Sequence, residues 1–175
     1  MKKWMAMLMA LMLTLVLPFS AGSAGEEVVP NVTELLKTYT TLDLSEHLGK
    51  TLVINFFTQW CGYCMQEMPD FKTVHDLYDP EQFEVVMVHV WDGEDASHTE
   101  NVKERFGMQE MIFFEDTDRL VAYAVGLQGY PATLVVNPDG TLNAAQSGMV
   151  TLEMLTAHLD DMGVARMQEA EDGTV

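Results

Sequence analysis

Short stretches of apolar residues recur along the chain and predict the strands of a buried sheet. Residues 51–57 and 83–90 are apolar almost without interruption, which is typical of strands covered on both faces, and we expect the first to be the central strand. Shorter strands are predicted at residues 111–114, 132–136 and 142–146. A strong turn signal at 137–140 joins the last two of these. Residues 39–44 alternate between polar and apolar and predict a further strand at the edge.

Apolar positions at intervals of three and four residues predict helices between these strands. The longest begins at Gly62 and continues to about Asp79, and Pro69 inside it removes one backbone donor and should bend it. Shorter helices are predicted at residues 32–39, 97–106, 117–125 and 151–162. Long crossovers between parallel strands, followed by an antiparallel hairpin and a closing helix, predict an α/β fold. Its central mixed β-sheet is flanked by helices on both faces.

The first 24 residues differ from the rest and predict a secretory signal. Lys2 and Lys3 precede an uncharged run rich in Met, Leu and Ala over residues 4–17, and small residues follow it. The run is shorter than the roughly 18–20 residues that cross a bilayer, and an uncleaved N-terminal anchor is the alternative. We expect residues 25–165 to form one domain. Residues 166–175 are acidic and poor in apolar side chains and predict a disordered tail.

Acidic residues greatly outnumber basic ones. The 175 residues include 27 Asp and Glu against 9 Lys and Arg, a formal charge of −18, and no basic cluster interrupts this excess. Such a charge argues against nucleic acid and against an anionic membrane surface as partners. We interpret the acidity as a soluble, self-repelling surface, and the alternative is steering toward a basic partner.

The two cysteines of the chain, Cys61 and Cys64, lie between the predicted central strand and the helix that follows it. The free N–H groups and the positive dipole end of a helix favour an anion there. A thiolate in this position is nucleophilic near neutral pH, and a second thiol in the same turn can close a disulfide. We expect Cys61, nearer the helix start, to be the nucleophile and Cys64 the resolving thiol. A purely structural disulfide would close a very small loop and stabilise little.

Metal chemistry finds less support in the sequence. The five histidines are scattered without the spacing of a metal motif, so we predict no metal and no cofactor besides a redox-active Cys61–Cys64 disulfide. Met65 rather than histidine follows Cys64, which excludes a covalent haem site. The soft ligands Cys61 and Cys64, with Met65 or His89, leave copper binding as an alternative.

Further residues around the cysteines carry a resemblance to a known family. The shared features are Trp60-Cys61-x-x-Cys64-x-x-Glu67-x-Pro69, Asn55 six residues before Cys61, Gly129-Tyr130-Pro131-Ala132-Thr133 and the turn at 137–140. Together they resemble thioredoxin-like proteins, and most closely the exported TlpA/ResA/CcmG-type thiol–disulfide oxidoreductases. The resemblance covers roughly residues 42–162 and implies the thioredoxin fold.

The resemblance also implies roles for side chains near the cysteines. Glu67 should share a helix face with Cys64, and the matching glutamate of the family is assigned to proton handling. Asn55 stands where thioredoxin carries a buried aspartate, and an amide cannot act as a base. Tyr130 and Pro131 are implied to form a cis peptide bond facing the cysteines, with Tyr130 touching the substrate.

Three residues beside the cysteines are less specific. Trp60 is expected to shield one side of the pair, although an ordinary core aromatic would give the same pattern. Gly62 and Tyr63, between the cysteines, are expected to tune the redox potential. The same dipeptide also occurs in a periplasmic disulfide isomerase.

With the resemblance, these features predict an exported reductant of protein disulfides, for example in cytochrome c maturation. Its electrons are expected from a membrane thiol donor, and its partners are protein disulfides and dithiols rather than nucleic acid. We expect a monomer in the bacterial periplasm or at the outer face of the cytoplasmic membrane. Two alternatives remain, a disulfide oxidase or isomerase of the same fold and a copper-binding assembly factor.

Overall fold

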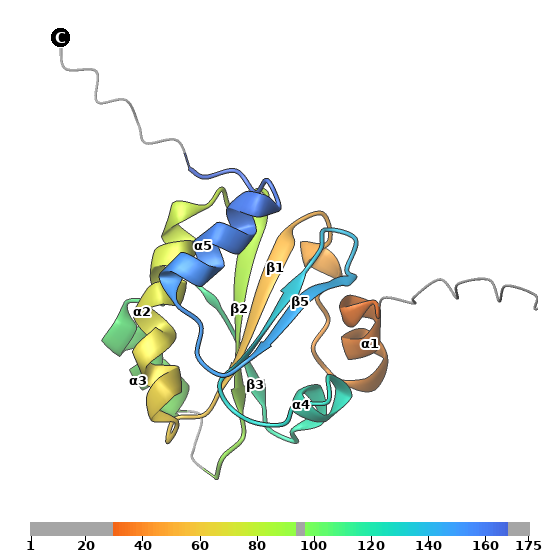
Figure 1. Ribbon diagram of the computed structural model, residues 1–175. Helices are drawn as coiled ribbons and strands as arrows, with labels where there is room; N and C mark the ends of the chain where they lie inside the picture. The colour runs from red at the N-terminus through yellow and green to blue at the C-terminus, as the bar shows by residue number, and fades with distance from the viewer. Residues whose placement is uncertain (1–29, 94–96, 168–175) are drawn as a thin grey trace, which may run out of the picture.

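The computed structural model describes residues 30–93 and 97–167, and a five-stranded mixed sheet runs through them (Figure 1). Its strands are β1 (Thr51–Phe57), β2 (Phe83–Val90), β3 (Ile112–Asp116), β4 (Ala132–Val136) and β5 (Leu142–Ser147). They are ordered β3-β2-β1-β4-β5, so β1 is central as predicted. β1, β2 and β3 are parallel, whereas β4 is antiparallel to β1 and β5 is antiparallel to β4.

Helices cover both faces of this sheet, which confirms the predicted architecture. They are α1 (Val32–Tyr39), the 3-10 helix η1 (Ser45–His47), α2 (Gly62–Leu77), α3 (Ser97–Phe106), α4 (Leu120–Ala124) and α5 (Leu152–Asp161). Figure 1 shows α2, α3 and α5 on one side of the sheet and α1 and α4 on the other.

The two faces of β1 explain why its sequence is apolar nearly throughout. All seven of its residues are buried. Val53 and Phe57 pack with the buried residues of α2, α3 and α5. Leu52, Ile54 and Phe56 pack with those of α1 and α4. Each large apolar side chain buried in this way contributes about 1.5–3 kcal/mol, so the strand is fixed from both sides.

Residues 39–44 do not form the predicted edge strand. α1 continues through Tyr39, and Thr40 ends it by donating its backbone N–H to Leu36 O at 2.8 Å. Leu42 and Leu44 are buried, with 5% and 1% of their surfaces exposed, but the segment is irregular rather than extended in a sheet. Alternation reports that every second side chain is buried, and it does not require pairing with another strand.

The folded part of the chain continues past the expected boundary at residue 165. Arg166 forms a bridge with Tyr78 and an ion pair with Asp160. The predicted signal at 1–24 and the acidic residues from 168 onward lie outside the described residues. Within the described ranges, no helix is both long and apolar enough to cross a membrane.

The sheet register brings the candidate site residues to one edge. β1 and β2 are parallel with Phe57 opposite His89, so the segments that follow both strands emerge together. β4 runs the other way with Ala132 opposite Phe56, so the residue that precedes it, Pro131, emerges at the same edge. Cys61 follows β1 there, which places the cysteines and the proline at the carboxyl ends of the parallel strands.

Candidate active site

Cys61 and Cys64 form a disulfide at the start of α2. Cys61 is the N-cap of this helix, and its Sγ accepts the backbone N–H of Cys64 at 3.2 Å. Cys61 retains 6% of its surface exposed, whereas Cys64 is fully buried. Of the two cysteines, Cys61 is therefore the one that solvent reaches. After reduction, its thiolate would occupy a position that a helix N-terminus stabilises.

Exposed aromatic side chains occur next to the nearly buried cysteines in the chain and directly after β2. Trp60 and Tyr63 are 69% and 65% exposed, and Trp91, directly after β2, is 48% exposed. The Trp60 ring meets the Tyr130 ring edge-on, with the ring centroids 6.2 Å apart. Trp60 is therefore not a core aromatic. The exposed rings of Trp60 and Tyr63, which neighbour Cys61 in the chain, form an aromatic rim.

The loop before β4 carries the proline that sequence reasoning singled out. The Tyr130–Pro131 peptide bond is cis, the isomer that the resemblance implied. Pro131 is buried, and Tyr130 is half-buried and packs against the core on both faces of the sheet. The contact between Tyr130 and Trp60 places this loop beside the turn that leads to Cys61.

Glu67 is buried one helical turn after Cys64, with 1% of its surface exposed. Its Oε1 accepts a hydrogen bond from Asn55 Nδ2 at 2.8 Å, and its Oε2 accepts the backbone N–H of Val150 at 3.0 Å. Burial raises the pKa of Glu67 to about 7, which nearby Asp70 reinforces and the two hydrogen bonds oppose. The carboxyl group thus changes charge near neutral pH, which suits proton exchange with a thiol.

Asn55 connects Glu67 to the sheet. Its Nδ2 also donates to Thr133 Oγ1 at 3.1 Å, and Asn55 and Thr133 are opposite each other in the β1–β4 register. Sequence reasoning selected Asn55 and Glu67 but missed Val150. A backbone amide 83 residues from Glu67 leaves no side-chain pattern by which it could be found.

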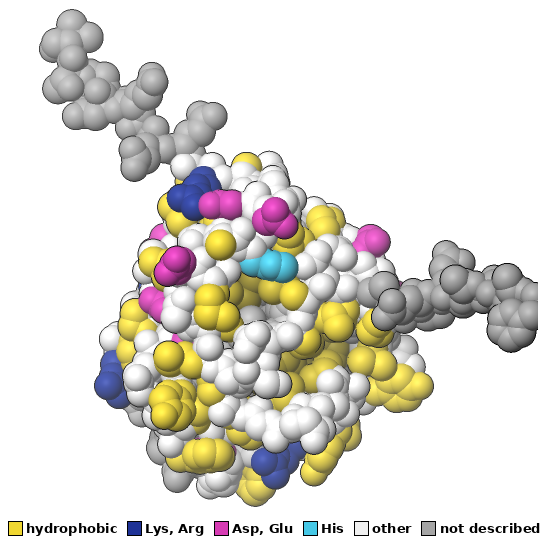
Figure 2. Space-filling model, in the orientation of Figure 1, with side chains coloured by type: hydrophobic (Ala, Val, Ile, Leu, Met, Phe, Trp, Pro, Cys, Tyr) yellow, Lys and Arg dark blue, Asp and Glu magenta, His cyan; other side chains and the backbone are white. Residues whose placement is uncertain are grey.

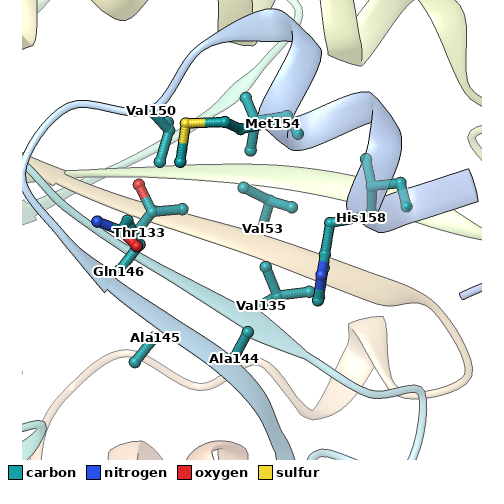
Figure 3. A pocket seen from close by; sticks show the side chains of 11 residues that line it. Val53, Thr133, Val135, Ala144, Ala145, Gln146, Val150, Met154 and His158 are labelled. Carbon is teal, nitrogen blue, oxygen red and sulfur yellow. The ribbon is translucent and has the colours of Figure 1, made fainter. Parts of the chain in front are cut away.

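A hollow of about 150 Å³ opens between α5 and strands β4 and β5, next to this network. Figure 3 shows Val53 and Thr133 of the sheet facing Met154 of α5 across it. In the surface view, hydrophobic side chains gather in the depression between α5 and β5 (Figure 2). Thr133 and Val150 both line the hollow, so it reaches two of the groups that form the network around Glu67.

His89 is engaged away from the cysteines. Its Nδ1 lies 2.8 Å from Glu115 Oε2 and its Nε2 lies 3.5 Å from Asp92 Oδ2, while its ring stacks on Phe57 at 5.2 Å between centroids. Both ring nitrogens of His89, a residue considered in the copper alternative, face carboxylates. Within residues 30–93 and 97–167, no group of three or more His, Cys, Asp and Glu side chains is arranged to hold a metal ion.

Several known proteins have sequences similar to this one. The sequence pattern of the AhpC/TSA family matches residues 26–145. The thiol-disulfide oxidoreductase ResA of Geobacillus thermodenitrificans is 30% identical over 120 residues, which are 68% of this chain and 67% of that protein. The sporulation thiol-disulfide oxidoreductase A of Bacillus subtilis is 24% identical over 151 residues, which are 83% of this chain and 90% of that protein.

Solved structures share the fold. A secreted disulfide oxidoreductase of Mycobacterium tuberculosis has a TM-score of 0.59 at 18% identity, covering 69% of this chain and 87% of that one. An exposed lipoprotein thioredoxin of Streptococcus pneumoniae has a TM-score of 0.59 at 17% identity, covering 67% and 89%. These likenesses concern the fold alone, and they confirm the predicted thioredoxin-like architecture.

Proposed function

The chain belongs to the AhpC/TSA family of thioredoxin-like proteins, and from that premise we propose that it is a thiol–disulfide oxidoreductase that reduces disulfides in exported proteins. The observation that carries the proposal is the Cys61–Cys64 disulfide at the start of α2, in which Cys61 is partly exposed and Cys64 is buried. The relatives named as thiol-disulfide oxidoreductases support the same activity.

The reaction is two successive exchanges at sulfur. The Cys61 thiolate of the reduced protein attacks one sulfur of a substrate disulfide, forming a mixed disulfide, and the other substrate sulfur leaves as a thiolate that takes up a proton. Cys64 then loses its proton and attacks Cys61 Sγ. The mixed disulfide breaks, the second substrate thiol is released, and the Cys61–Cys64 disulfide forms. Two electrons have passed from the protein to the substrate.

Glu67 is the group that manages the proton of Cys64. It lies one turn along the same helix, and its pKa of about 7 leaves both protonation states populated near neutral pH. Its ionised form can accept the Cys64 proton, and its charge opposes a second anion nearby. Asn55 holds one carboxylate oxygen and cannot itself take a proton. A Glu67→Gln variant should therefore change the pH at which the two thiols titrate, and unchanged titration in the reduced variant would exclude this role.

The aromatic rim and the loop before β4 form the surface for the substrate polypeptide. Trp60 and Tyr63 present exposed rings, and Tyr130 lies against Trp60 beside Pro131. Gly62 and Tyr63 are exposed between the cysteines, where they contribute to the redox potential. No metal enters this scheme, since the disulfide itself is the redox group.

The direction of electron flow is that of a reductant in the periplasm or at the outer face of the cytoplasmic membrane, fed by a membrane thiol donor. The apolar run near the N-terminus supports export. The resemblance to exported TlpA/ResA/CcmG-type proteins suggests apocytochrome c as a candidate substrate. The reduction potential distinguishes the reductant from an oxidase or isomerase of the same fold. A value well below the glutathione range of about −220 to −260 mV supports the reductant, and a value near or above it supports the others.

Trapping the mixed disulfide tests the whole proposal. Cys64→Ser leaves the nucleophile but removes the resolving thiol, so it should accumulate a Cys61-linked mixed disulfide with exported proteins that mass spectrometry can identify. Cys61→Ser is the matched control and should trap nothing and reduce no insulin. Full insulin reduction by Cys61→Ser would exclude the enzyme.

A further inference from the structure

A second buried polar cluster lies at the carboxyl end of β2 and has no part in the exchange scheme above. His89 and the side chain of Asp92 are each 1% to 2% exposed, and Glu115 on β3, with 31% of its side chain exposed, completes the cluster. Val85 and Met87, which share a face of β2 with His89, are buried apolar residues of the core. A histidine therefore occupies a position where the strand pattern calls for another apolar side chain.

The cluster fixes the His89 ring from three sides. Phe57 stacks on it with an interplanar angle of 25°. Its Nδ1 lies 2.8 Å from Glu115 Oε2 and 3.2 Å from Thr99 Oγ1, on β3 and α3. The remaining nitrogen, Nε2, faces Asp92 Oδ2 at 3.5 Å, which is longer than an ordinary hydrogen bond, and a proton on Nε2 makes this contact attractive.

Asp92 connects this cluster to the turn that leads to the nucleophile. The same Oδ2 atom accepts the backbone N–H of Gln59 at 3.0 Å. Gln59 lies two residues before Cys61, in a turn that also closes through the Cys61 N–H and Thr58 O at 3.3 Å. The buried carboxylate of Asp92 thus holds Gln59 at one end of the turn, and the other end carries the sulfur of Cys61.

Burial of imidazole and carboxylate groups costs free energy unless they hold one another. An apolar residue would fill this end of β2 more simply, as Val85 and Met87 do at the preceding positions on the same face. The polar cluster provides an oriented acceptor, Asp92 Oδ2, for the backbone N–H of Gln59.

We propose that His89 is a positioning residue for thiol–disulfide exchange. It holds the Asp92 carboxylate against the Gln59 amide and thereby fixes the turn that presents Cys61 Sγ to the substrate. Glu115 in turn orients the imidazole. The inference rests on the proposed role of Cys61 as nucleophile, because exchange requires the attacking sulfur to be held in line with the substrate disulfide.

The test compares four variants of the full exported chain. His89→Phe keeps a ring on Phe57 but removes both nitrogens, and Asp92→Ala removes the acceptor. Asp92→Asn keeps an acceptor oxygen for the Gln59 N–H. Asp139→Ala is the matched control: Asp139 also accepts a backbone N–H at 3.0 Å, from Thr141, but in the turn at the opposite end of the sheet.

The readouts are kcat/KM for insulin reduction, the rate of Cys61 alkylation against pH in the reduced protein, the reduction potential and the unfolding temperature. We expect His89→Phe and Asp92→Ala to lower kcat/KM on the order of 10-fold and to alter the alkylation profile. Asp92→Asn should recover most of the loss, and Asp139→Ala should leave every value except the unfolding temperature unchanged.

The inference is overturned if folded His89→Phe and Asp92→Ala react within about twofold of the unaltered protein, or if Asp92→Asn is as slow as Asp92→Ala. If His89→Phe does not fold, His89→Gln takes its place with the same threshold. Cys61→Ser in the same assay separates the two proposals. Retained activity in Cys61→Ser refutes the enzyme, whereas an inactive Cys61→Ser beside normal His89 and Asp92 variants refutes only the positioning role.

Discussion

Replacing Glu67 with glutamine should remove a pH dependence of stability that this one carboxyl group creates. In the native protein Glu67 holds its proton up to a pKa of about 7, whereas in the unfolded chain it ionises near its ordinary pKa of 4.5. Between these values the native state binds one proton more than the unfolded state. The stabilisation is therefore fully present below pH 4.5 and is lost as the pH rises through about 7.

The size of the effect follows from the same two values. The interval from 4.5 to about 7, at about 1.36 kcal/mol per pH unit, corresponds to roughly 3 kcal/mol. Glutamine is neutral at every pH, so the variant lacks this pH-dependent contribution to the free energy of unfolding. Its NH₂ group must also face either the Asn55 amide or the Val150 N–H, both of which are donors, at a cost of roughly 1–3 kcal/mol.

Urea unfolding of the oxidised protein from pH 5 to pH 8 measures the difference, because the disulfide-bonded cysteines do not titrate. We expect Glu67→Gln to be less stable than the unaltered protein at pH 5 and to equal or exceed it at pH 8. Buried Asp116, whose pKa is raised by burial, contributes equally to both proteins and cancels. Glu153→Gln, on the exposed side of α5, is the control for loss of one surface charge.

A constant difference would refute the reasoning. If the stabilities of Glu67→Gln and the unaltered protein differ by the same amount, within about 0.5 kcal/mol, at both ends of the pH range, then Glu67 is ionised in the native state throughout. In that case its burial does not govern its protonation, and the proton-handling role loses its physical basis.

Three further substitutions test separate parts of the structure. Phe71→Ala should cost about 3–5 kcal/mol in urea unfolding, because Phe71 is fully buried between α2 and the sheet and leaves a cavity, and a loss below 1 kcal/mol would contradict that packing. Arg119→Gly should stabilise the protein by about 0.5–1 kcal/mol, since Arg119 has a φ of 62° that glycine adopts without strain. Trp60→Ala should raise KM for insulin severalfold, because this exposed ring contacts Tyr130 beside the cysteines. It should leave the unfolding temperature nearly unchanged, and the rate for a small disulfide is the control.

The sequence predicted the sheet well where burial on both faces leaves a continuous apolar run. β1 is apolar except at Thr51 and Asn55, and all of its residues are buried in the centre of the sheet. The alternation at residues 39–44 was misread as a strand, because Leu42 and Leu44 are buried beside an irregular segment. Pattern alone reports which side chains are buried and not which backbones are paired.

The residues of the candidate site also fall into those that sequence reasoning identified and those that it missed. Cys61 and Glu67 lie close together along one predicted helix, so the sequence identified them, whereas Pro131 was identified through the resemblance to thioredoxin-like proteins. The backbone of Val150 and the link from His89 through Asp92 to Gln59 depend on segments brought together by the fold. Sequence reasoning therefore treated His89 as a scattered residue or a metal ligand, although its neighbours are carboxylates.

The position of Cys61 Sγ at the N-cap of α2 has a thermodynamic consequence. Reduction turns a neutral cap into an anionic one, which the helix end favours, so this contact stabilises the reduced protein and makes the oxidised form a stronger electron acceptor. Ionised Glu67 acts in the opposite sense, because a second negative charge near the thiolate favours release of electrons. Acidification below about pH 7 neutralises the carboxylate and shifts the couple toward accepting electrons, so the driving force for reduction follows the acidity of the compartment.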